Sequence, residues 1–281
     1  NVLLFIKFTQ PLHMEIQAIK SLTDNYIWAM ISHQKVTIVD PGSAAPVLEF
    51  LKHHRHLNCD HVLITHHHYD HTGGIAEIHA AYPQAQIHGP KLLLKAYNST
   101  NVDICVPTQN VSQKTTVTLR ENEAPWQIIK TPGHTLDHLC FYTPGYLFCG
   151  DTLFSAGCGR LLEGTAKQLF DSLKKIAKLP DKTKIYPAHE YTLDNIQFAE
   201  YIEPENKKLQ AYKKATAEKI QAGTPSLPST IQIEKDINPF LRCHLPNIHK
   251  RIERLTSSSF FSSLEVFTAL RKLKDHFTCS Q

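Results

Sequence analysis

Short apolar runs alternate with turns and with segments of helical spacing from residue 14 to about residue 189. Residues 36–39 are apolar or β-branched and run into Asp40-Pro41-Gly42, a pattern typical of a strand that ends in a turn. Residues 61–65 form a second run of this kind, and residues 47–54 and 75–82 have the spacing of helices. Further strands are predicted at residues 127–131, 139–143, 146–149 and 184–186. Strands interleaved with helices predict a layered α/β architecture.

The pattern changes after residue 189, where helical spacing replaces the strand pattern. Residues 194–222 and 262–277 are predicted to be helical, and the loop at residues 223–229 is rich in proline and serine. The clean pattern begins at Met14. The chain therefore divides into three predicted parts: an N-terminal extension or cloning remnant over residues 1–13, an α/β domain over residues 14–189, and an appended small all-α domain over residues 190–281.

The composition is that of an ordinary folded protein. Of the 281 residues, 42% are hydrophobic and 20% are charged, which excludes general disorder. The formal charge of +4 is too small to indicate a nucleic-acid or membrane partner. The expected partner is a small-molecule substrate, and the expected oligomeric state is a monomer. No apolar run reaches the ~18 residues that a membrane helix needs. The 7 cysteines contain no C-x-x-C pair, which favours buried thiols in a reducing, cytoplasmic compartment.

Histidine is unusually frequent, with 18 residues that do not form a terminal run. The segment at residues 65–71 reads Thr-His-His-His-Tyr-Asp-His and directly follows a predicted strand. Because alternate residues of an extended chain point the same way, His66 and His68 can bind one metal ion while His67 faces away. This segment is the first indication of a metal site.

Further ligands are available at the ends of other predicted strands. Asp70 and His71 lie on the turn that follows the histidine run, and His134, Asp151 and His189 each follow an apolar strand. Imidazole and carboxylate ligands suit zinc, iron and manganese. We predict two divalent metal ions per chain, with zinc as the first choice and iron or manganese as alternatives. The predicted division assigns His66, His68 and His134 to one ion, assigns Asp70, His71 and His189 to the other, and makes Asp151 the bridge.

Some of these residues have simpler interpretations when taken alone. An isolated His134 or His189 is more often an ordinary polar residue than a ligand. Asp40 precedes Pro41-Gly42, so a turn role is favoured over a supporting role at the metal site. The complete H-x-H-x-D-H string with three further ligands is what makes the metal interpretation specific.

The H-x-H-x-D-H motif with the later histidines and aspartate resembles the metallo-β-lactamase superfamily. Within it, the chain resembles the hydroxyacylglutathione hydrolases, also called glyoxalase II, from about residue 19 to residue 277. The strings that carry this resemblance lie at residues 22–26, 150–154, 157–160, 163–165, 189–192, 238–242 and 274–277. The resemblance implies a four-layer αββα domain with a dinuclear metal centre, and a helical domain that helps to bind glutathione.

The resemblance also implies the reaction. The family hydrolyses S-D-lactoylglutathione and other 2-hydroxyacylglutathiones to glutathione and D-lactate, which detoxifies methylglyoxal. All seven metal ligands match, and Asp70 and Asp151 would be catalytic together with a hydroxide that bridges the ions. The substrate contacts that carry over are Arg160, Tyr191, Arg271 and Lys274, and Leu162 stands where some members have a tyrosine.

Three other functions fit parts of the pattern. A glutathione persulfide dioxygenase of the same superfamily uses one iron and keeps much of the histidine motif, but the helical domain and the basic pair Arg271 and Lys274 argue against it. These two residues are three apart and are expected to share one helical face. A nucleic-acid-processing member would need a stronger basic patch. A non-catalytic metal-binding protein would be expected to have lost ligands, and all seven are present.

Overall fold

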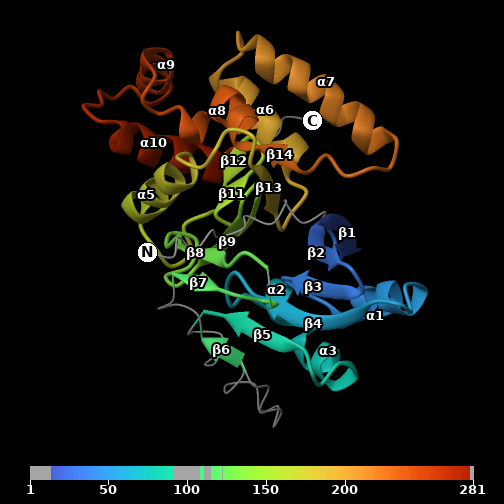
Figure 1. Ribbon diagram of the computed structural model, residues 1–281. Helices are drawn as coiled ribbons and strands as arrows, with labels where there is room; N and C mark the ends of the chain where they lie inside the picture. Colours follow the sequence, from blue (N-terminus) through green and yellow to red (C-terminus); the bar gives the residue numbers. More distant parts are fainter. Residues whose placement is uncertain (1–13, 91–107, 111–114, 122, 279–281) are drawn as a thin grey trace, which may run out of the picture.

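Two six-stranded sheets pack face to face in the computed structural model, with helices on their outer faces (Figure 1). The structure describes residues 14–90, 108–110, 115–121 and 123–278. The predicted extension at residues 1–13 lies outside the described residues. No helix among the described residues combines the length and apolar character needed to cross a bilayer.

The first sheet has the strand order β1-β2-β3-β4-β5-β6. Its strands are β1 (Glu15–Ser21), β2 (Asn25–Ser32), β3 (Lys35–Val39), β4 (Asn58–Leu63), β5 (Gln86–Gly89) and β6 (Thr108–Asn110). The pairs β1/β2 and β2/β3 are antiparallel, and the pairs from β3 to β6 are parallel. Helices α1 (Ala44–His53) and α3 (Ile75–Ala81) share a buried apolar cluster with this sheet. The sequence predicted both helices and the strands β3 and β4, but not β1 and β2.

The second sheet has the order β14-β13-β10-β9-β8-β7. Its strands are β7 (Thr116–Val117), β8 (Trp126–Lys130), β9 (Leu139–Thr143), β10 (Tyr146–Gly150), β13 (Lys184–Pro187) and β14 (Ser229–Thr230). A small hairpin of β11 (Leu153–Phe154) and β12 (Gly157–Cys158) follows β10. The strands predicted at residues 127–131, 139–143, 146–149 and 184–186 are β8, β9, β10 and β13.

The helices on the outer face of the second sheet come mostly from the C-terminal third of the chain. They are α5 (Ala166–Ile176), α6 (Thr192–Ile202), α7 (Lys207–Gln221), α8 (Ile231–Ile237), the 3₁₀ helix η1 (Pro239–Leu241), α9 (Pro246–Thr256) and α10 (Ser263–Asp275). The sequence analysis did not predict α5, whose first turn is closed by a capping box between Thr165 and Gln168. Strand β14 lies within the predicted all-α part and pairs with β13.

Aromatic side chains fill the space between the sheets. Trp28 of the first sheet packs edge-on against Tyr186 of the second with ring centroids 4.9 Å apart, and Phe148 stacks on Tyr186 at 5.0 Å. A separate apolar cluster joins the outer face of the second sheet to α5, α6, α9 and α10. The C-terminal helices therefore share a core with the α/β part.

Backbone hydrogen bonds tie the two sheets together at one edge. The amide of Tyr26 donates to the carbonyl of Ala188 at 2.7 Å, and the amide of Leu139 donates to the carbonyl of Thr65 at 2.9 Å. The loops that follow β4, β8, β10 and β13 meet at this edge, and they carry the predicted metal ligands (Figure 1).

Candidate metal centre

Three imidazoles converge at the end of β4. His66 Nε2 lies 3.0 Å from His68 Nδ1, and His134 Nε2 lies 3.2 Å from the same His68 atom. His66 is fully buried, and the ring of His67 points elsewhere, with Nε2 3.0 Å from a carboxylate oxygen of Glu163. The structure therefore brings together the three residues that the sequence assigned to the first ion.

A second group of donors lies beside the first. Helix α2 (Tyr69–Thr72) carries Asp70 and His71, and the loop after β13 carries His189. Asp70 Oδ2 lies 3.5 Å from His71 Nε2 and 3.4 Å from His189 Nε2. These are the three residues assigned to the second ion.

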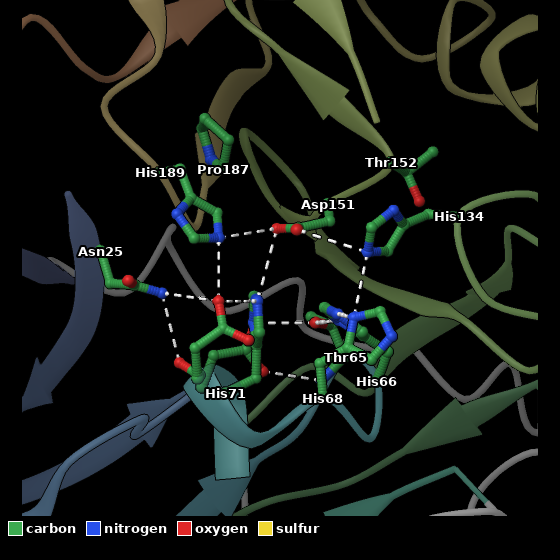
Figure 2. Close-up of polar contacts among 12 residues, drawn as sticks. Asn25, Thr65, His66, His68, His71, His134, Asp151, Thr152, Pro187 and His189 are labelled. Carbon is green, nitrogen blue, oxygen red and sulfur yellow. Dashed lines mark hydrogen bonds and ion pairs between the residues drawn. The ribbon is translucent and has the colours of Figure 1, made fainter. Parts of the chain in front are cut away.

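Asp151 lies between the two groups, as Figure 2 shows. Its Oδ2 atom is 3.5 Å from His134 Nε2 in the first group. Its Oδ1 atom is 3.5 Å from His71 Nε2 and 3.4 Å from His189 Nε2 in the second group. Each carboxylate oxygen thus faces a different group, which is the arrangement that a bridging ligand requires.

The donor atoms are suited to hold cations. His71 Nε2 and Asp151 Oδ1 are buried and have no hydrogen-bond partner among the described residues. Nitrogen and oxygen ligands lie about 2.0–2.2 Å from zinc, so neighbouring ligand atoms around one ion are roughly 3–3.5 Å apart. The separations in both groups fall in this range. Both predicted groups are among the four clusters of described residues that could hold a metal ion, and the other two are His66, His71 and Asp151, and His67, His68 and Glu163.

The protonation states differ between the two groups. Burial lowers the pKa of His66 well below its usual value, and the charges of neighbouring histidines lower it further. Burial also lowers the pKa of His68 and of His134. The first group therefore presents neutral imidazoles, the form that binds a metal ion.

Neighbouring carboxylates together decide the direction in which the pKa values of the imidazoles in the second group are shifted. Burial by itself would lower the pKa of His71, but Asp151, Asp40 and Asp70 outweigh it and raise the pKa to about 10. Burial would raise the pKa of Asp151, yet His71 and His189 hold it below its usual range. The carboxylates around these imidazoles supply negative charge that divalent cations would neutralise.

A further shell of polar groups orients the ring nitrogens that face away from the centre. His189 Nδ1 lies 2.7 Å from Asp24 Oδ1, and His134 Nδ1 lies 2.9 Å from the carbonyl oxygen of Arg160. Such contacts determine the tautomer and the direction of each ring. The sequence analysis did not single out Asp24, which is 165 positions away from His189.

The interpretation of Asp40 as a turn residue was incomplete. Its φ of +51° does place it in a tight turn, but its carboxylate is buried and lies 3.2 Å from His71 Nδ1. It also accepts hydrogen bonds from Thr65, at 2.8 Å from the amide and 2.7 Å from the hydroxyl. Asp40 therefore supports His71 and holds the start of the histidine loop.

His138 is another buried residue that the sequence analysis missed. Its Nε2 accepts a hydrogen bond from the amide of Asp151 at 3.1 Å, and its ring stacks on His66 at 4.8 Å. Gly150 precedes Asp151 with φ +47°, and a side chain there would collide with the hydroxyl of Thr65. Together these residues hold the backbone from which Asp151 projects.

The residues expected to contact glutathione occupy different environments. Arg160 is exposed, and Tyr191 is half-buried with its ring stacked on His189 at 4.7 Å. Lys274 is half-buried, and its ammonium donates to the carbonyl of Asp194 at 3.1 Å. Leu162, at the position of a tyrosine in some family members, is 52% exposed.

Arg271 is buried, unlike Lys274, with which it was expected to share a helical face. Its side chain is buried, with 3% of the residue exposed. One terminal nitrogen donates to the carbonyl of Cys158 at 3.0 Å, and the other pairs with Asp275 at 3.0 Å. The sequence analysis expected Arg271 to contact the substrate together with Lys274, and the structure shows that its guanidinium instead reaches into the protein.

Two family profiles cover most of the chain. The profile described as Metallo-beta-lactamase superfamily matches residues 23–189, and the profile described as Hydroxyacylglutathione hydrolase C-terminus matches residues 190–277. The hydroxyacylglutathione hydrolase of Edwardsiella ictaluri is 43% identical over 265 residues, which cover 94% of this chain and 100% of that protein. The hydroxyacylglutathione hydrolase of Photobacterium profundum is 44% identical with the same coverage.

Solved structures share the fold at lower identity. The BLEG-1 B3 metallo-β-lactamase has a TM-score of 0.59 at 20% identity, with 81% of this chain and 99% of that chain covered. ETHE1 from Myxococcus xanthus has a TM-score of 0.59 at 22% identity, with 94% of this chain and 91% of that chain covered. These likenesses show the metallo-β-lactamase fold and nothing finer.

Proposed function

Since the chain belongs to the hydroxyacylglutathione hydrolase family of the metallo-β-lactamase superfamily, we propose that it hydrolyses the thioester of S-D-lactoylglutathione and related 2-hydroxyacylglutathiones. The products are glutathione and D-lactate. The protein is accordingly an enzyme, a hydrolase with a metal-binding site. The observation that carries the proposal is the combination of a seven-donor centre in the α/β part with a C-terminal part, residues 190–277, that matches the hydroxyacylglutathione hydrolase C-terminus profile.

We propose two divalent ions per chain, with zinc as the first choice. One would be held by His66, His68 and His134, the other by Asp70, His71 and His189, with Asp151 shared between them. The placement of the two Asp151 oxygens towards different groups supports this division. When bound, such ions polarise a carbonyl oxygen and lower the pKa of a coordinated water towards neutrality.

The residues of the chain set the charge of this centre. Asp70 and Asp151 offset about half of the charge of two divalent ions, so a net positive charge remains to attract the thioester carbonyl oxygen. Asp24 and Asp40 hold the outer nitrogens of His189 and His71, which keeps these rings aimed at the centre. The leaving thiolate has an ordinary pKa of about 8.5, so it departs without a proton donor from the protein.

We propose that Arg160, Tyr191 and Lys274 contact the glutathione part of the substrate. Arg160 supports this role because its backbone already contacts His134 while its side chain is exposed. Lys274→Met should raise KM for glutathione thioesters about tenfold to a hundredfold, the equivalent of one charge-assisted contact of about 1.5–3 kcal/mol. A thioester without the glutamyl and glycyl carboxylates is the control, and its KM should not change.

We also propose that the protein is a cytoplasmic monomer that acts on a small molecule. The described cysteines support a reducing compartment because all five are free and buried. Size-exclusion chromatography with light scattering tests the monomer.

The activity is tested with purified protein loaded with each metal in turn. Loss of the thioester absorbance of S-D-lactoylglutathione, with about two metal ions per chain by elemental analysis, is the expected result. The matched control is the same protein after chelation and then after reloading. Oxygen uptake with glutathione persulfide, without thioester hydrolysis, would instead identify the dioxygenase alternative.

A further inference from the structure

A segment of three residues, 158–160, links the C-terminal helix α10 to the metal centre. On the side of α10, the Nη1 atom of Arg271 donates to the carbonyl oxygens of Cys158 at 3.0 Å and of Gly159 at 3.4 Å. The guanidinium also lies over the ring of Phe240, 5.2 Å from its centroid. These contacts bury a cation at the junction between the C-terminal helices and the α/β part.

On the other side, the same segment contacts two of the candidate metal ligands. The carbonyl oxygen of Arg160 lies 2.9 Å from Nδ1 of His134. Gly159 packs directly on Asp151, since a side chain at Gly159 would collide with the Asp151 carbonyl oxygen and would lie 3.3 Å from the Cβ atom of His134. The amide of Gly159 also donates to the carbonyl of Thr152 at 3.3 Å. A shift of this segment would therefore move His134 and Asp151.

We propose that Arg271 is a positioning residue of the metal centre, which acts by holding the segment 158–160 against His134 and Asp151. The proposal rests on the proposed function in that these two residues are taken as metal ligands. His134 belongs to the first group and Asp151 is shared, so the ion bound by the first group depends most on Arg271. The C-terminal helices then contribute to the metal centre as well as to substrate binding.

The chemistry of arginine suits this role. A planar guanidinium presents several donors in fixed directions, so one side chain can hold two successive carbonyls while its other terminal nitrogen pairs with Asp275. A lysine at the same position keeps the charge but presents a single nitrogen. Arg271→Lys should therefore retain part of the function, and Arg271→Met, which has similar length without donors, should retain least.

The experiment compares the metal affinity of the intact protein with that of three variants. These are Arg271→Met, Arg271→Lys and, as the matched control, Lys274→Met on the same helix. Each protein is titrated against a chromophoric chelator, and the cobalt-substituted forms are compared by their visible absorption. Circular dichroism and the thermal midpoint show whether each variant is folded.

Loss of a partner that orients a metal ligand weakens metal binding about tenfold to a hundredfold. Arg271→Met should lose affinity by this factor for one ion of the two, with an altered cobalt spectrum and a lower kcat at a nearly unchanged KM. Arg271→Lys should fall between Arg271→Met and the wild type. Lys274→Met should keep the wild-type metal affinity and raise KM instead.

Three results would overturn the proposal. In the first, Arg271→Met binds both ions with wild-type affinity and has a raised KM, which would make Arg271 a direct glutathione contact. In the second, its thermal midpoint falls while metal affinity and the cobalt spectrum stay unchanged, which would make it a structural brace alone. The third result applies if Arg271→Met does not fold. Arg271→Lys is then measured by the same criteria, and wild-type metal affinity in that variant would overturn the proposal. The metal readout does not depend on thioester hydrolysis, so failure of the wild-type activity assay would overturn the proposed function and leave this test intact.

Discussion

Replacing Asp151 tests the bridging arrangement most directly. Asp151→Ala removes both oxygens, whereas Asp151→Asn keeps the shape of the side chain and one oxygen. Because the two oxygens face different donor groups at 3.4–3.5 Å, the two variants should differ. We expect the alanine variant to lose affinity for both ions, and the asparagine variant to retain at most one.

The expected loss of metal affinity follows from comparison with residues that only orient a metal ligand. Loss of a partner that only orients a ligand costs about tenfold to a hundredfold in metal affinity. Loss of a shared ligand should exceed a hundredfold, which corresponds to about 2.7 kcal/mol or more. Competition with a chromophoric chelator measures this range, and elemental analysis after gel filtration gives the number of ions retained by each variant.

His67→Ala is the control within the same loop. The His67 ring lies against Glu163 and Asp137, at 3.0 and 3.6 Å, and of the proposed ligands only His68 has a donor atom clustered with those of His67 and Glu163. Its removal should change metal affinity by less than the roughly tenfold effect of an outer partner. Equal metal loss in the His67 and Asp151 variants would refute the geometry argued for the centre, as would an Asp151→Asn protein that still binds both ions tightly.

Three further predictions concern an outer partner of the metal centre, an ion pair in the C-terminal part, and the effect of chelation on stability. Asp24→Asn should lower the affinity for the ion held by His189 about tenfold to a hundredfold, because the 2.7 Å contact to His189 Nδ1 loses its charge. Chelator competition measures this affinity, and an unchanged value would contradict the prediction. Glu203→Ala leaves Arg242 with the carbonyl of Lys235 but without its carboxylate partner. It should lower the free energy of unfolding in urea by about 3 kcal/mol, with metal content unchanged. Chelation should remove about 2.7 kcal/mol of stability for each ion whose free concentration is about a hundred times its Kd, or about 5.4 kcal/mol for two ions. The thermal midpoint in calorimetry should then fall by about 10–20 °C, and an unchanged midpoint would argue against coupling of metal binding to folding.

The parts of the fold that could be predicted are those with strong local patterns. The run at residues 139–143 is the strand β9, and the strand before the histidine motif is β4, so the alternation of His66 and His68 could be predicted as well. Helix α5 was missed although Thr165 and Gln168 have the spacing of a capping box. This spacing is the signal from which the start of α5 can be predicted.

Contacts between residues far apart in the sequence could not be predicted. Asp24 and His189 are brought together by pairing between the turn before β2 and the loop after β13, and nothing near either residue indicates the other. For Arg271 a signal did exist: it lies four positions after the fully buried Phe267, which places both on one helical face. Its charge was assigned to substrate binding, whereas in the structure its guanidinium donates hydrogen bonds to the backbone carbonyls of Cys158 and Gly159.

The centre depends on the packing of the two sheets because each supplies part of it. The loop after β4 in the first sheet contributes four of the seven donors, and loops after β8, β10 and β13 in the second sheet contribute the other three. Ions that bind both sets would oppose separation of the sheets, since the unfolded chain offers no such arrangement. The segment 158–160 extends this dependence to the C-terminal helices through Arg271. A centre built in this way would need both sheets and the C-terminal helices to be packed before it could bind metal, so residues far from the histidine motif would contribute to it.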